Sequence, residues 1–184
     1  MPPVALLAPG YQGNADQAVL RKLSVRLESS GIVARAMQFG KRARPSRDYT
    51  AELDELRGAR DSLVAEHPGS LALVGRSFGG RMCTFLAERE PPAALVVLGY
   101  PVSPPGRPRP RDEAALAALT CPTLIVQGDR DDLGPLDVLQ GIAAANPRVE
   151  VAVVQGAGHS YGRKEAEAVE MVVVWLERVL ALPP

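Results

Sequence analysis

The chain has 184 residues, the size of one ordinary domain, and we expect a single domain over 1–184 that is long enough to bury a full core. Hydrophobic residues make up 46% of it, charged residues 23%, and the formal net charge is zero. A balanced charge argues against a nucleic-acid or membrane-surface protein, because those classes carry a basic excess. We expect neither partner.

Cysteine usage and the first residues narrow the class further. Cys83 and Cys121 form no CxxC pair and have no histidine cluster beside them, so we expect two reduced core thiols, no metal and no cofactor. The apolar stretch Val4–Ala8 is short, lies between prolines and follows no basic segment, which is unlike a signal peptide. No apolar run approaches the roughly 20 residues of a membrane span. These observations predict a cytoplasmic protein, as a monomer or homodimer.

The first half of the chain alternates short apolar runs with longer amphipathic ones. In chain order we predict a strand over 4–8, a helix over 16–30, a strand over 32–39, a helix over 49–66 and a strand over 71–74. The first helix shows Val19, Leu20, Leu23 and Leu27 at helical spacing, and Gly31 ends it.

The second half repeats the alternation. We predict a helix over 78–90, a strand over 94–98, a short helix over 112–119, a strand over 123–126, a helix over 136–145, a strand over 149–154 and a closing helix over 163–182. The segment 100–111 holds five prolines and is predicted to be irregular. Trp175 lies at helical spacing in the closing helix and is expected in the core.

Repeated strand–helix units with continuously apolar strands predict a three-layer α/β domain. About six parallel strands are expected, with helices on both faces and right-handed crossovers. Several folds share this pattern, so any function has to be inferred from the sites.

Reactive side chains follow three of the predicted strands. The segments are Gly75–Gly80, Gly128–Asp132 and Gly156–Ser160. Because ligands bind outside the carboxyl ends of parallel strands, a hydroxyl, a carboxylate and an imidazole are expected at one edge of the sheet. Their order along the chain, Ser, Asp, His, is that of α/β-hydrolases.

The turn Gly75-Arg76-Ser77-Phe78-Gly79 matches the G-x-S-x-G pattern between a strand and a helix. A nucleophilic serine needs such a tight turn to project its oxygen above the sheet, and side chains at the two glycines would collide with neighbouring backbone. We predict Ser77 as nucleophile; the alternative is a helix N-cap.

His159 is the predicted general base. The chain has only two histidines, and His67 ends a helix on the opposite edge of the sheet, where the helix dipole favours it. The alternative for His159 is an exposed loop histidine. The carboxylate that orients the base is predicted to be Asp131, since a Gly-x-x-Asp turn lets it point back toward the histidine; Asp129, and less so Asp132, remain alternatives.

An oxyanion hole requires two backbone N–H groups. One is predicted from Phe78, which follows the nucleophile, and the other from Tyr11 in the loop after the first strand. An ordinary turn is the alternative for the glycines of that loop. Neither phosphate-binding glycine pattern occurs there.

Four segments resemble the small α/β-hydrolases related to dienelactone hydrolases. They are Pro9-Gly10, Gly-Arg-Ser-Phe-Gly-Gly-Arg (75–81), Cys-Pro-Thr-Leu-Ile-Val-Gln-Gly-Asp-Arg-Asp (121–131) and Gly-Ala-Gly-His-Ser (156–160). The testis-expressed/KANSL-type branch, with G-[KR]-S-M-G-G-R, is the nearest pattern. The resemblance implies a minimal α/β-hydrolase fold, the triad Ser77, Asp131 and His159, and the oxyanion donors Tyr11 and Phe78.

Three departures accompany the resemblance. Pro9 replaces a frequent histidine, the family's antiparallel first strands are absent, and serine replaces the cysteine of dienelactone hydrolases proper. Lactone specificity is therefore not implied. The segment 100–111 is too short for a cap domain, so we expect an open site and a small or surface-exposed ester.

Two basic features remain open. The loop Lys41–Arg47 is either solvated or contacts an anion near the site, and Arg76 either meets a substrate anion or forms a helix-end salt bridge. The pattern as a whole predicts a serine esterase or thioesterase acting through an acyl-enzyme. The alternatives are a non-catalytic interaction protein with this fold and an acyltransferase variant.

Overall fold

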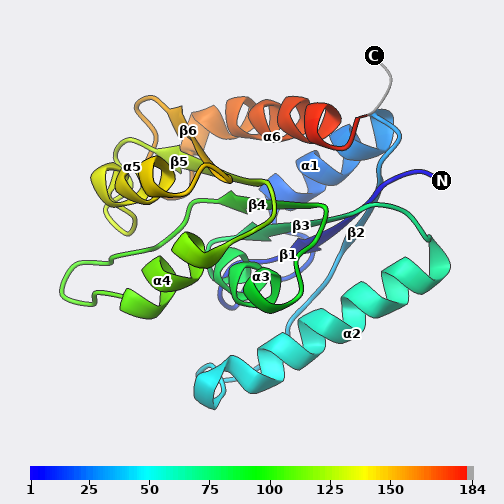
Figure 1. Ribbon diagram of the computed structural model, residues 1–184, viewed down its shortest axis with the longest axis horizontal. Coiled ribbons are helices and arrows are strands. Elements are labelled where there is room, and N and C mark those ends of the chain that lie inside the picture. Colours follow the sequence, from blue (N-terminus) through cyan, green and yellow to red (C-terminus); the bar gives the residue numbers. More distant parts are fainter. Residues whose placement is uncertain (182–184) are drawn as a thin grey trace.

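Six parallel strands form one sheet in the order β2-β1-β3-β4-β5-β6, as the computed structural model of residues 1–181 shows (Figure 1). The strands are β1 (Val4–Ala8), β2 (Val33–Ala36), β3 (Leu71–Arg76), β4 (Ala94–Leu98), β5 (Thr123–Gly128) and β6 (Val149–Val154). Every residue of β1 and β4 is buried, as expected for strands covered on both faces. Because all pairs are parallel, the carboxyl ends of the strands meet at one edge.

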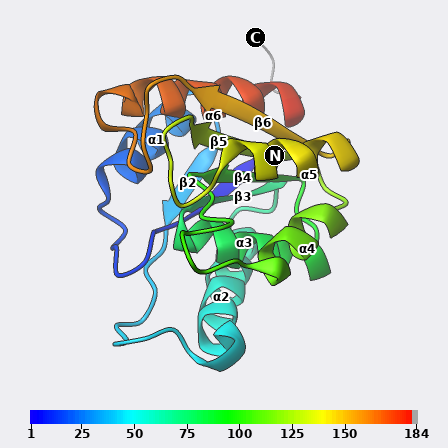
Figure 2. The same cartoon turned by 90° about the vertical axis from the view of Figure 1, so that its left-hand side faces the viewer.

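Helices cover both faces of this sheet. They are α1 (Ala18–Ser29), α2 (Thr50–Glu66), α3 (Phe78–Arg89), α4 (Pro110–Ala118), α5 (Leu136–Ala145) and α6 (Glu165–Val179), with short 3-10 turns at Arg47–Tyr49 and Gly162–Lys164. The helices α1 and α6 pack on one face and α2 to α5 on the other (Figures 1 and 2). Alternate residues of β1 therefore enter different cores: Leu6 faces α2 to α5, and Leu7 faces α1 and α6.

The predicted architecture is confirmed: a three-layer α/β fold with six parallel strands and helices on both faces. The strands over 4–8, 94–98 and 149–154 and the helix over 136–145 have the predicted bounds. Cys83 and Cys121 are buried free thiols, and Trp175 is buried.

Several predicted bounds were wrong, mostly because strand pairing extends or ends elsewhere. The second strand stops at Ala36, the last residue paired with β1, whereas 32–39 was expected. Two strands run further: β3 includes Arg76, which pairs with Leu98, and β5 includes Gly128, which pairs with Val154.

The ends of five helices also differ from the prediction; α2 begins at Thr50 and α3 ends at Arg89, each one residue inside the predicted bounds 49–66 and 78–90. The first helix starts at Ala18, and α4 starts at Pro110, inside the segment expected to be irregular, since proline suits the first helical position. The closing helix spans Glu165–Val179 and not 163–182; Leu182 lies outside the described residues. None of the helices in residues 1–181 has the length and apolar character needed to cross a bilayer.

Candidate active site

Ser77 occupies a strained turn between β3 and α3. Its backbone has φ 50° and ψ −109°, a region that costs a non-glycine residue about 1–3 kcal/mol. A Cβ at Gly75 would lie 2.3 Å from the backbone nitrogen of Gly80, and one at Gly79 would lie 2.4 Å from the carbonyl oxygen of Ala8. Side chains at either glycine would therefore force the turn open.

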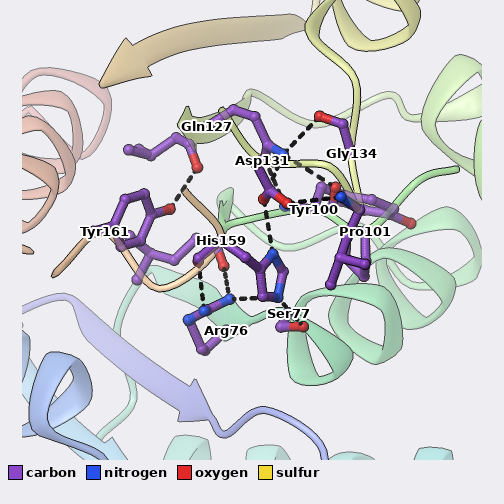
Figure 3. A network of polar contacts seen from close by, with 12 residues as sticks. Arg76, Ser77, Tyr100, Pro101, Gln127, Asp131, Gly134, His159 and Tyr161 are labelled. Atoms are coloured by element: carbon purple, nitrogen blue, oxygen red, sulfur yellow. Dashed lines mark hydrogen bonds and ion pairs between the residues drawn. The ribbon is translucent and has the colours of Figure 1, made fainter. Parts of the chain in front are cut away.

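Three side chains from three loops meet at the carboxyl edge of the sheet (Figure 3). Ser77 Oγ lies 2.9 Å from Nε2 of His159, and Nδ1 of His159 lies 2.7 Å from Oδ2 of Asp131. If the buried carboxylate accepts from Nδ1–H, Nε2 is left with the lone pair that can take the serine proton. His67, which follows α2 before β3 begins, belongs to the opposite edge.

The geometry also separates the neighbouring aspartates. Asp131 is buried, and its Oδ1 accepts a hydrogen bond from the backbone N–H of Leu133 at 3.0 Å. Asp129 is exposed and accepts from the backbone N–H of Gly156 at 2.6 Å, so it serves as a turn residue. Asp132 is exposed as well. Only Asp131 is brought to the imidazole.

Arg76 lies beneath the imidazole rather than in solvent (Figure 3). Its Nη2 donates to the carbonyl oxygen of His159 at 2.6 Å and its Nη1 to that of Leu98 at 3.1 Å. Nη1 is also 3.2 Å from Nε2 of His159. Within residues 1–181 it has no carboxylate in ion-pair contact, and burial lowers the pKa of Arg76. Of the two alternatives for Arg76, the helix-end salt bridge does not form among residues 1–181, and the guanidinium instead contacts the backbone and imidazole of His159.

Gln127 is a site residue that the sequence analysis missed. Its Nε2 donates to Oδ2 of Asp131 at 2.8 Å and to the carbonyl of Gly134 at 2.9 Å, while its Oε1 accepts from the backbone N–H of Tyr100 at 2.7 Å. The side chain thus links β5, the Asp131 loop and the end of β4. A polar residue inside an otherwise apolar strand, four positions before the aspartate, was the available signal.

The two residues predicted as oxyanion donors lie against each other. Phe78 is the first residue of α3, and Tyr11 lies in the loop after β1; their rings meet edge to face with centroids 5.6 Å apart. Across residues 1–181 neither backbone N–H has a hydrogen-bond acceptor in the protein. The loop is held by Gln17, whose Oε1 accepts from the N–H of Gly10 at 3.0 Å. Backbone N–H groups without an acceptor of their own are available to stabilise a developing oxyanion.

The chain matches one known family along nearly all of its length. The family described as an alpha/beta hydrolase domain matches residues 4–180. An uncharacterized protein of Mycobacterium tuberculosis is 29% identical over 183 aligned positions, and the match covers 86% of this chain. The chain spans only 63% of the length of that curated relative.

Solved structures agree on the fold. An alpha-beta serine hydrolase homologue from Coxiella burnetii superposes with a TM-score of 0.81 at 22% identity, covering 95% of this chain and 85% of that one. A serine hydrolase without lid from Xanthomonas campestris superposes with a TM-score of 0.77 at 20% identity, covering 100% and 85%. At these identities the likeness establishes the shared fold.

Proposed function

The chain belongs to the α/β-hydrolase domain family, and from this premise we propose that it is a serine hydrolase that cleaves a carboxylic ester or thioester through an acyl-enzyme on Ser77. One observation carries the proposal: the continuous hydrogen-bonded path from Ser77 Oγ through the imidazole of His159 to Asp131, at 2.9 and 2.7 Å. Serine, base and orienting carboxylate in this geometry form the constellation that activates a hydroxyl nucleophile.

The reaction has two halves, acylation of Ser77 and hydrolysis of the acyl-enzyme, and the same side chains act in both. Ser77 Oγ attacks the carbonyl carbon while Nε2 of His159 takes its proton, and the negative charge moves to the carbonyl oxygen. The N–H groups of Tyr11 and Phe78 donate to that oxygen. Collapse of the intermediate expels the alcohol or thiol, which receives the proton from His159. Water then repeats the sequence on the acyl-enzyme and releases the acid.

Asp131 acts by stabilising the imidazolium and setting the tautomer of His159. Its own orientation depends on donors from Gln127 and the backbone of Leu133. Asp131, His159, Gln127 and Leu133 all come from strands of one sheet or from the loops after them. No large conformational closure is therefore required before the reaction.

We further propose an open site for small or surface-exposed esters. The segment between β4 and α4 contains no cap domain, in keeping with the lidless fold relative. Little discrimination among acyl chain lengths is therefore expected on p-nitrophenyl esters; a strong preference for long chains would contradict it. The dienelactone-hydrolase-like kinship remains part of this proposal, and it rests on the motif at 75–81.

The test is covalent labelling with a fluorophosphonate probe, combined with hydrolysis of p-nitrophenyl acetate. Wild type should be labelled, and Ser77→Ala should lose both signals. His159→Ala should reduce both by several orders of magnitude. Ser160→Ala, which removes the exposed neighbouring hydroxyl, is the matched control and should behave as wild type. An unlabelled, inactive wild type would support the non-catalytic interaction protein instead.

A further inference from the structure

A cavity of about 530 Å³ reaches Phe78, the residue after the serine, on the side of β1 and β2. We call it the basic pocket; it is lined by 11–14, 38–45, Glu52 and Phe78. The pocket shares Tyr11 and Phe78 with the proposed oxyanion hole. The loops after β1 and β2 form its walls, and they run along the same side of the molecule in Figure 2. An ester held by that hole therefore has one arm next to the pocket.

The wall of the basic pocket is braced. The hydroxyl of Tyr11 donates to the carbonyl of Ala43 at 3.0 Å, which joins the two loops. Glu55, on α2, accepts from the backbone N–H of Gly40 at 3.0 Å and forms an ion pair with Arg42. These contacts fix an exposed, basic segment over a cavity. A loop that is merely solvated would not require such contacts, so they favour the alternative in which the loop contacts an anion.

Positive charge dominates the lining. The lining contains three basic residues, Lys41, Arg42 and Arg44. Glu52 is the only acidic residue in the lining. Glu52 is buried, and although burial acts to raise its pKa, hydrogen bonds from the hydroxyl and backbone N–H of Ser46 hold the pKa below its usual value. Glu52, in the first turn of α2, is thus a carboxylate already bound by the loop that precedes its helix.

Two of the cations remain unneutralised. Arg42 is paired with Glu55 and lies 3.8 Å from Glu52. Within the described part of the chain, Lys41 and Arg44 have no carboxylate at ion-pair distance. Both are exposed, so each is free to meet an incoming anion.

The floor of the pocket is aromatic. Phe78 packs edge to face against Tyr11 and Phe39, with centroids 5.6 and 5.7 Å apart. An apolar or aromatic group can lie on this floor, and its far end would reach the cations.

We propose that the basic pocket binds one arm of the ester substrate, an apolar or aromatic spacer that ends in a carboxylate or phosphate. This inference rests on the proposed function, because Ser77 supplies the reaction and the pocket selects the arm. The cations are exposed, so the expected selectivity is modest: together Lys41 and Arg44 contribute on the order of tenfold in kcat/KM.

The first arm of the test places the anion on the acyl side. We compare kcat/KM for mono-p-nitrophenyl adipate with that for p-nitrophenyl hexanoate, which has the same chain length and no charge. The anionic ester should be preferred, and its advantage should shrink as salt rises because exposed charges are screened. The Lys41→Ala/Arg44→Ala double variant should lose about tenfold in the ratio of the two values. Arg148→Ala, an exposed arginine before β6 at the opposite edge, should keep the wild-type ratio.

The second arm places a phosphate on the alcohol side, with 4-acetoxyphenyl phosphate compared with 4-methylphenyl acetate. A preference for the anion in either series, lost in the double variant, supports the proposal and identifies the arm. Equal values in both series, with Ser77 still labelled by the fluorophosphonate, overturn the basic pocket and leave the hydrolase intact. Absence of labelling and of all turnover removes the proposed function, and this inference with it.

Discussion

Two buried arginines lie on either side of the Ser77 turn, and they are held in opposite ways. Arg81, in the first turn of α3, contacts both oxygens of Asp112, at 2.5 and 3.0 Å, and the hydroxyl of Tyr49 at 3.0 Å. Arg76, at the end of β3, donates to two carbonyl oxygens, contacts the imidazole of His159 and lies over the ring of Tyr161, with no carboxylate at ion-pair distance in residues 1–181. Burial works against both charges; Asp112 nevertheless raises the pKa of Arg81, whereas the pKa of Arg76 is lowered.

The difference indicates what each arginine does. A buried, bidentate ion pair between α3 and α4 joins two helices, and breaking one partner leaves a buried charge. A buried cation without a counter-ion contributes little to folding, so its contacts are better explained by the geometry that they impose on the His159 loop. Arg81 is therefore expected to control stability, and Arg76 to be a positioning residue for the proposed reaction.

The largest effect is expected at Arg81. Arg81→Met leaves the carboxylate of Asp112 buried without its partner and should lower the free energy of unfolding by about 3–5 kcal/mol in urea titrations. The double variant Arg81→Met/Asp112→Leu removes both charges and should recover most of that loss. A single variant as stable as wild type would erase the contrast with Arg76.

Arg76→Met should reverse the pattern. It removes the donors to the carbonyls of His159 and Leu98, so the imidazole is expected to shift and kcat on p-nitrophenyl acetate to fall by on the order of 10- to 100-fold. The free energy of unfolding should change by only about 1 kcal/mol, because a costly buried charge is removed with its contacts. Arg76→Lys, which restores charge without the planar fork, should recover little of kcat. Equal losses of stability and rate would assign Arg76 a structural role alone.

Gln127→Leu should have a smaller effect on the same network. The substitution takes one donor from Asp131 and leaves the N–H of Tyr100 without its acceptor, so kcat should fall roughly tenfold and stability by about 1–3 kcal/mol. Kinetics and urea titration of the same sample measure both. Gln140→Leu, on the exposed side of α5, is the control for the change in polarity and should leave both unchanged.

The smallest effect is expected for an ion pair at the surface, between the half-buried Arg35 and the exposed Glu66. Hydrogen bonds from Arg35 and then Ser62 lower the pKa of Glu66 to about 2, from an ordinary value of 4.5. Since the folded pKa is depressed, this contribution to stability is present above pH 4.5 and is lost as the pH falls toward 2. Glu66→Gln should thus bring the urea midpoint down slightly at pH 7 and flatten its decline between pH 4.5 and 2. Glu88→Gln, at an exposed position without an ion pair in residues 1–181, should do neither.

The sequence alone was sufficient for the strand–helix alternation and for the candidates Ser77 and His159. Hydrophobic periodicity and the steric requirement of the G-x-S-x-G turn are both local properties of the sequence. Of the two histidines, only His159 comes directly after the carboxyl end of a predicted strand. The meeting of these residues at one edge followed from the rule that parallel strands end together.

Only the tertiary structure decided between the aspartates and assigned the buried polar residues. Asp129 and Asp131 lie in one turn, and the direction of each carboxylate depends on loop contacts with Gly156 and with His159, which are distant in sequence. The same holds for Arg76, whose partners include the carbonyl oxygens of Leu98 at the end of β4 and of His159 in the loop after β6. Every residue has a backbone carbonyl, so the sequence does not show which of them will accept. Local patterns determined the elements and the reactive residues. Long-range packing determined which of those residues meet.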